Sequence, residues 1–147
     1  MQLTTHTDYA LRLLIYLALS EDRAPATVQE IALSYGISAN HIAKVAQTLV
    51  QQGYIHSLRG RGGGLALAAS PDTVRVGAVV RDTENLRLLE CFGPDSSCPI
   101  DPACTLKKAL GRAQEAFLEE LDRYTLADMV ANGGELRGLL AYGRSGP

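Results

Sequence analysis

Apolar residues recur at helical spacing within the first twenty positions of the chain. Members three, four and seven positions apart share one face of an α-helix, and the set comprises Ala10, Leu11, Leu14, Ile15, Leu17 and Ala18. The hydroxyls of Thr5 and Thr7 can cap the start of a helix. We therefore expect a helix from about Asp8 to Ser20, which the Pro25-containing segment 21–26 ends.

Two shorter helical patterns follow and are joined by a tight turn. Thr27 and Glu30 have the spacing of a capping box, which begins the first helix, and Gly36 ends it. Ser38 begins the second helix, whose apolar face comprises Ile42, Val45, Ala46 and Leu49. Two helices joined by a glycine turn are typical of a helix-turn-helix, although an ordinary antiparallel helix pair has the same spacing.

Short strand patterns after these helices favour the helix-turn-helix. Residues 54–58 and 65–69 are typical of strands, and the glycine-rich residues 60–64 form the turn between them. A hairpin in this place is the wing of a winged helix. Arg59 and Arg61 lie at its tip, where glycine lets the backbone approach a phosphate chain closely and arginine suits a narrow minor groove. We expect residues 1–70 to form a winged helix-turn-helix DNA-binding domain.

A longer helical pattern begins at Thr105, and its apolar stripe comprises Leu106, Ala109, Leu110, Ala113, Phe117, Leu121 and Tyr124. A helix of about twenty residues is about 30 Å long. We interpret the stripe as a dimer interface rather than as a face packed within its own domain. The fold class is mostly α: the winged head, a connecting helix within residues 71–90, a dimerisation helix and a final short helix within 105–132, and a flexible tail at 133–147.

Composition favours a cytoplasmic protein without membrane contact. Apolar residues make up 46% of the chain and charged residues 20%, as in ordinary globular proteins. The longest apolar stretch, residues 11–19, contains Arg12 and is too short to span a bilayer. No positively charged start leads into a cleavable apolar segment. We therefore expect the chain to work in a reducing compartment.

Cys91, Cys98 and Cys104 lie within one stretch, CFGPDSSCPIDPAC. An odd number of cysteines in a reducing compartment favours metal or redox chemistry over disulfides. The glycines and prolines disfavour helix and strand, so residues 91–104 form a loop that can wrap a ligand. The spacing does not match the close cysteine pairs of zinc sites. An iron–sulfur cluster accepts wider spacing but needs a fourth ligand; a redox thiol switch and a structural role stay open.

Charge indicates only local contacts with nucleic acid. The net charge is −2, and residues 1–69 hold five lysines and arginines against four acidic residues. A DNA contact must therefore depend on a few placed groups. The second helix of the head predicts contacts to bases and phosphates from Ser38, Asn40, His41, Lys44, Gln47 and Thr48. An enzyme is not expected, because no nucleophile–base set stands out and the GRGGG run lacks the strand-to-helix context of a nucleotide site.

Five stretches carry a family resemblance: MQLTTHTDYALRLLIYLA, ISANHIAKVAQTLVQQGYI, RGRGGGLAL, CPIDPACTLKKAL and LDRYTLADMV. They resemble the NsrR group of nitric-oxide-responsive repressors, a branch of a winged-helix superfamily that also contains IscR and RirA. The resemblance runs from Met1 to about Val130. IscR-type sequences have a histidine three residues after the last cysteine, where this chain has Lys107, so the resemblance favours the NsrR branch.

This resemblance implies a homodimer that represses genes by binding an inverted-repeat operator in double-stranded DNA. It also implies a [4Fe-4S] cluster held by the three cysteines, with Asp8 of the partner subunit as fourth ligand; a [2Fe-2S] cluster is the alternative. Nitric oxide would break the ligand bonds and lift repression. A regulator of the same fold that senses iron or redox state, and a small electron-transfer protein, remain as alternative functions.

Overall fold

The first helix, α1 (Thr5–Leu19), forms the centre of the head in the computed structural model, which describes residues 1–23 and 25–144. Thr4 is its N-cap, and the Thr4 hydroxyl accepts a hydrogen bond from the Thr7 backbone N–H. The helix thus begins three residues before the expected Asp8, because Thr4 caps it in place of Thr5 and Thr7. Ala10, Leu13 and Leu14 are fully buried, which makes α1 the core helix of the head.

The helix-turn-helix is confirmed as α2 (Val28–Tyr35) and α3 (Ala39–Gln51). Thr27 and Glu30 form both hydrogen bonds of the capping box. Gly36 ends α2 in the left-handed conformation, with φ of 66°, which glycine adopts without steric cost. The Ser38 hydroxyl caps α3. The predicted apolar face of α3 is buried and packs on α1, so the opposite face is free for a ligand.

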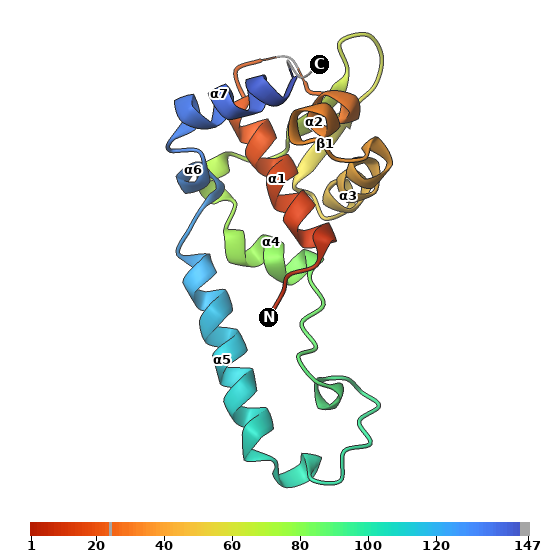
Figure 1. The fold of residues 1–147 in the computed structure, drawn as a ribbon, viewed down its shortest axis with the longest axis vertical. Coiled ribbons are helices and arrows are strands. Elements are labelled where there is room, and N and C mark those ends of the chain that lie inside the picture. Colours follow the sequence, from red (N-terminus) through yellow and green to blue (C-terminus); the bar gives the residue numbers. More distant parts are fainter. Residues whose placement is uncertain (24, 145–147) are drawn as a thin grey trace.

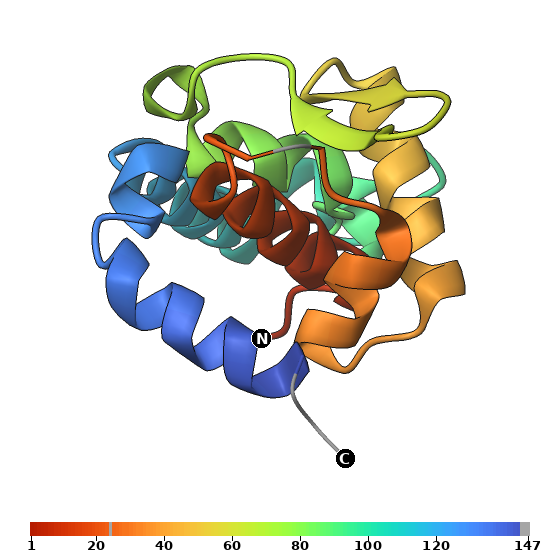
Figure 2. The same ribbon diagram turned by 90° about the horizontal axis from the view of Figure 1, so that it is seen from above.

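The wing is confirmed as an antiparallel hairpin of β1 (Ile55–Leu58) and β2 (Gly64–Leu67), with Ile55 opposite Leu67. Buried Leu65 forms an isolated bridge with Ala26, the residue before the cap of α2. This bridge fixes the hairpin to the start of the helix-turn-helix, as Figure 2 shows from above.

Beyond the wing, a 3₁₀ turn (Pro71–Thr73) leads into α4 (Val76–Thr83), which is shorter than the connecting segment 71–90. The chain then leaves the head as an extended arm with two 3₁₀ turns (Glu90–Phe92 and Asp101–Ala103). It returns along α5 (Thr105–Asp122). Figure 1 shows the arm and α5 extending together away from the head.

The short helix α6 (Leu126–Met129) is confirmed, with a capping box between Thr125 and Asp128. The flexible tail expected from residue 133 differs from the structure, because residues Gly133–Arg144 form a helix, α7. This helix packs on α1 and α2, and Arg137 Nε donates a hydrogen bond to the carbonyl of Leu19 at the end of α1 (3.1 Å). Packing thus orders a segment of weak helix formers; residues 145–147 lie outside the described part.

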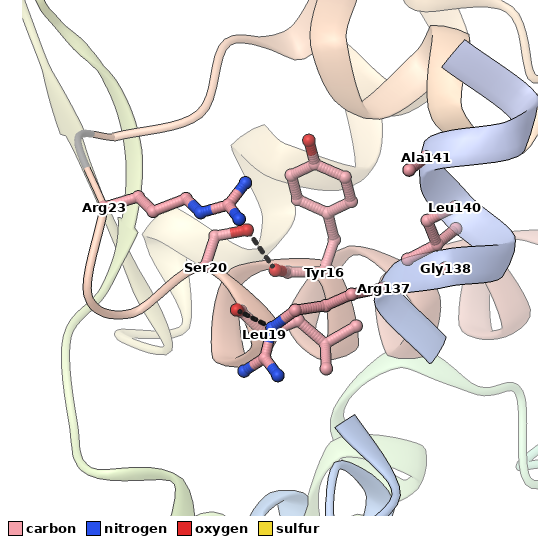
Figure 3. Close-up of a pocket in the computed structure, with 8 residues that line it drawn as sticks. All are labelled: Tyr16, Leu19, Ser20, Arg23, Arg137, Gly138, Leu140 and Ala141. Carbon is pink, nitrogen blue, oxygen red and sulfur yellow. Dashed lines mark hydrogen bonds between the residues drawn. The ribbon is translucent and has the colours of Figure 1, made fainter. Parts of the chain in front are cut away.

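A hollow separates the end of α1 from α7, with Tyr16 between the side chains of Arg23 and Arg137 (Figure 3). It lies on the head, on α1 and α7 rather than on the arm that carries the cysteines. In the described part of the chain, no helix combines the length and apolar character needed to cross a membrane.

Candidate functional site

The exposed face of α3 carries most of the predicted DNA contacts. Asn40, Lys44 and Gln47 are exposed, at positions that follow one another along the helix. Ser38 serves as the N-cap, and its hydroxyl accepts the backbone N–H of His41 (3.4 Å). The structure thus brings these four residues to one side of α3, the side opposite the core.

His41 and Thr48 have intramolecular partners that the sequence did not reveal. The His41 ring packs edge-on against the ring of Tyr9 on α1, with 4.8 Å between centroids and 75° between planes. The Thr48 hydroxyl donates to the carbonyl of Lys44 (3.3 Å). Both side chains are half-buried. His41 therefore also links the predicted reading helix to α1, a role that helical spacing within α3 alone could not show.

The wing presents its two arginines on the same functional surface. Arg59 and Arg61 are exposed at the tip, between Gly60 and Gly62, whose φ angles of 93° and 74° require glycine. A groove runs between the starts of α2 and α3 and the wing, and Asn40 lines it together with Gln29 and Ser57. Gln29 and Ser57 are exposed polar residues of this surface that sequence reasoning missed, because they lie on separate elements.

The three cysteines lie on the arm, half-buried and without disulfides. Cys91 lies in the first 3₁₀ turn of the arm, and Cys98 follows in the irregular stretch. Cys104 is the N-cap of α5, and its sulfur accepts the backbone N–H of Lys107 (3.3 Å). A cysteine cap was not predicted, because the sequence pattern favoured only a loop that ends near this residue.

Hydrogen bonds within the cysteine segment (residues 91–104) and at its ends give the arm a defined shape. Glu90 Oε1 accepts from both the backbone N–H and the hydroxyl of Ser97, each at 2.7 Å, and these bonds lower the pKa of Glu90. Lys107 Nζ lies 2.6 Å from Asp101 Oδ1, and this bond lowers the pKa of Asp101. The loop is therefore braced at both ends by its own polar side chains.

The donor chemistry of this segment fits an iron–sulfur cluster. Its three sulfur atoms are soft donors of the kind that iron–sulfur clusters take, and none is consumed in a disulfide. In residues 1–23 and 25–144, no group of three or more His, Cys, Asp or Glu side chains is close enough to hold a single metal ion. The segment thus offers ligands for a larger group rather than a compact one-ion site.

Asp8, the predicted fourth ligand, is on the first turn of α1 and away from the cysteines of its own chain. Both of its carboxylate oxygens accept hydrogen bonds from Arg12 (2.9 Å each). The guanidinium of Arg12 also lies 5.6 Å from the ring centre of Tyr9 and 5.9 Å from that of Tyr35. Burial raises the pKa of Tyr35 to about 12. Asp8 can therefore reach cysteines only on a second copy, and only if Arg12 shares its oxygens.

Hydrogen bonds also join the start of α1 to the end of α4, where the arm begins. Glu84 Oε2 accepts from the backbone N–H and the hydroxyl of Thr4 (2.8 and 3.1 Å). The Thr83 hydroxyl donates to that of the fully buried Thr7 (3.1 Å). These bonds connect the arm to α1, which in turn contacts α3 through Tyr9 and His41.

Comparisons with known proteins match this arrangement over nearly the whole chain. The model of the Rrf2 family, described as an iron-dependent transcriptional regulator, matches residues 3–132. The chain is 45% identical over 144 residues to the HTH-type transcriptional regulator NsrR of Shouchella clausii, covering 97% of each chain. It is 44% identical over 142 residues to that of Bacillus subtilis, covering 95% of this chain and 97% of the relative.

Solved structures with the same fold include IscR of T. potens. It matches with a TM-score of 0.72 at 26% identity, over 92% of this chain and 90% of that chain. CymR, the global cysteine regulator of B. subtilis, matches with a TM-score of 0.71 at 25% identity, over 90% of this chain and 98% of that chain. The similarity therefore includes the head, the arm and α5 together.

Proposed function

The chain belongs to the Rrf2 family of transcriptional regulators, and from this premise we propose that it is a homodimeric repressor with a nitric-oxide-sensitive iron–sulfur cluster. The repressor binds an inverted-repeat operator in double-stranded DNA while it holds the cluster and releases the DNA when nitric oxide attacks it. It acts in the cytoplasm. The observation that carries the proposal is the placement of three unpaired, half-buried thiols on an arm that is bonded to the DNA-binding head.

Cys91, Cys98 and Cys104 would hold the cluster, with Asp8 of the partner subunit as the fourth ligand. A [4Fe-4S] cluster suits this set of four ligands best, and a [2Fe-2S] cluster is the alternative. When bound, the cluster supplies iron that nitric oxide can attack at its weakest ligand. Arg12 keeps the Asp8 carboxylate in place by two hydrogen bonds, so that Asp8 is positioned before it meets the second copy.

The head would bind DNA through α3 and the wing. In a two-fold symmetric dimer, the two copies of α3 enter successive major grooves, where Asn40, Lys44 and Gln47 face the bases and phosphates. Arg59 and Arg61 of each wing enter the flanking minor grooves. The bonds from Glu84 and Thr83 to the start of α1 let a change in the arm shift α1, and through Tyr9 and His41 the reading helix.

An anaerobic titration with nitric oxide tests the proposal. The full chain is purified and reconstituted without oxygen, and its visible absorbance and binding to its own upstream DNA are followed together. We expect a broad iron–sulfur band that bleaches as nitric oxide is added, with DNA release over the same range. A chain that stays colourless after reconstitution would contradict the proposal, and zinc or thiol chemistry would replace the cluster.

A second candidate is a regulator that senses iron supply, which the family description as iron-dependent favours. The same titration separates the two functions. A coloured chain that nitric oxide neither bleaches nor releases from DNA, but that leaves DNA after iron chelation, is an iron sensor. Both functions use the same cysteines and the same head.

Replacing Arg61 by alanine tests the wing. Removing one phosphate or minor-groove contact should weaken DNA binding by about 1–3 kcal/mol, with little effect on folding because Arg61 is exposed. Fluorescence anisotropy with upstream DNA at fixed salt measures the affinity. Exposed Arg112 on α5 provides a matched control, and R112A should bind as the unmodified chain does. An R61A variant with unchanged affinity would remove the wing from the interface.

A further inference from the structure

The ion pair between Lys107 and Asp101 lies inside the cysteine site and has no part in the function described so far. Lys107 Nζ is 2.6 Å from Asp101 Oδ1, and the two side chains are only 35% and 23% exposed. By comparison, the side chains of the Arg123–Glu120 pair at the other end of α5 are 74% and 55% exposed. A partly buried pair is screened less by water and salt than an exposed one.

Lys107 is also bonded to the sulfur site through its backbone. Its N–H donates to Cys104 Sγ (3.3 Å), so the lysine and this thiol share the first turn of α5. The hydrogen bond to Asp101 raises the pKa of Lys107, and the charges of Cys91 and Cys104 add to that rise. The ammonium therefore lies within electrostatic reach of two of the three thiols.

Building on the proposed function, we propose that Lys107 sets the charge of the cysteine site. Asp101 holds the Lys107 ammonium beside Cys91 and Cys104, where its positive charge stabilises the additional negative charge of a reduced iron–sulfur cluster. A protonated ammonium has no lone pair to give to iron, so Lys107 acts through its charge and not as a ligand. Net charge and exposure are among the properties that set the reduction potential of such clusters.

The test compares K107M with K108M in the full chain, reconstituted without oxygen. Methionine has nearly the length of lysine without its charge, and exposed Lys108 is the adjacent lysine of the same turn. The midpoint potential of the cluster is measured by a spectroscopic redox titration. We expect the equilibrium constant of one-electron reduction to fall about tenfold in K107M, a shift of about 59 mV to more negative potential. K108M should match the unmodified chain, and K107R should restore its potential.

A K107M potential equal to that of K108M would overturn the inference. Where K107M does not retain a cluster, iron content decides: retention by K107R supports a requirement for the charge, and loss from K107R shows that only the shape of lysine matters and overturns it. The unmodified chain is read first. A colourless unmodified chain contradicts the proposed function itself, whereas a coloured one with unchanged K107M contradicts only the role of Lys107.

Discussion

At Gly77, α4 approaches α5 so closely that no side chain fits between them. A Cβ atom there would collide with the carboxylate of Asp122 and lie 2.8 Å from the backbone oxygen of Leu118. That carboxylate is already bound to Arg81 Nη1 at 2.6 Å, so it cannot move away without breaking the ion pair. Gly77 therefore determines how the long helix is attached to the head.

G77A should lower the free energy of unfolding by about 1–3 kcal/mol, the usual cost of overpacking. Urea denaturation followed by circular dichroism measures the change. Gly138 on α7 is the matched control, since a Cβ there meets nothing within 4 Å. G138A should be neutral or slightly stabilising, because alanine favours a helix over glycine. Equal stability of the two variants would refute the close approach of α4 and α5.

Glu84 is the titratable residue that joins the start of α1 to the arm. Burial acts to raise its pKa, but hydrogen bonds from Thr4 and neighbouring groups outweigh burial, and the pKa lies below its ordinary value of 4.5. A carboxyl whose pKa is lowered on folding stabilises the fold above the unfolded-state pKa and loses that contribution as pH falls through the folded-state pKa.

E84Q should therefore be less stable than the unmodified chain at pH 7, by about 1 kcal/mol for the weakened hydrogen bonds. The difference should shrink as the pH falls below about 4.5 towards 3. Urea denaturation at several pH values measures both curves. E119Q, at an exposed position of α5, should follow the unmodified chain throughout. A difference that stays constant with pH would show that the Glu84 charge has no part in this junction.

Elements whose signals are local were predictable from the sequence. The capping box of α2, the left-handed Gly36 and the cap of α3 each depend on residues within one turn, and all three were found where expected. By contrast, α7 is rich in glycine, and its order comes from packing on α1 and α2 and from the bond between Arg137 and Leu19. Such tertiary contacts leave no periodic signal in the segment itself.

The same division applies to the candidate site. The loop that carries the cysteines was predictable, because its glycines and prolines exclude regular structure. The partners of its side chains were not: Asp101 bound to Lys107 and Cys104 as a helix cap depend on how the loop turns into α5. Similarly, the sequence placed Asp8 on the first turn of a helix but could not show that Arg12 engages both its oxygens.

At the scale of the whole molecule, α5 has two different faces. Leu118 is buried on the side that packs on α4, whereas several members of the apolar stripe remain open to solvent. Leu106 is 60% exposed and Tyr124 43% exposed, and Ala109 and Ala113 are exposed between them. An apolar stripe of this length on a projecting helix favours association with a second copy, which would cover the stripe and bring Asp8 of one subunit towards the cysteines of the other.

L106D should therefore separate the dimer into monomers, because a carboxylate in an apolar interface must lose its hydration without gaining a partner. L139D is the matched control: Leu139 on α7 is 66% exposed and lies outside the stripe. Sedimentation equilibrium should show L139D as a dimer at concentrations where L106D is monomeric. The monomer would present only one α3 to an operator with two half-sites and would lack its fourth cluster ligand. If L106D stayed dimeric with its cluster intact, the shared site would have to be formed through another surface.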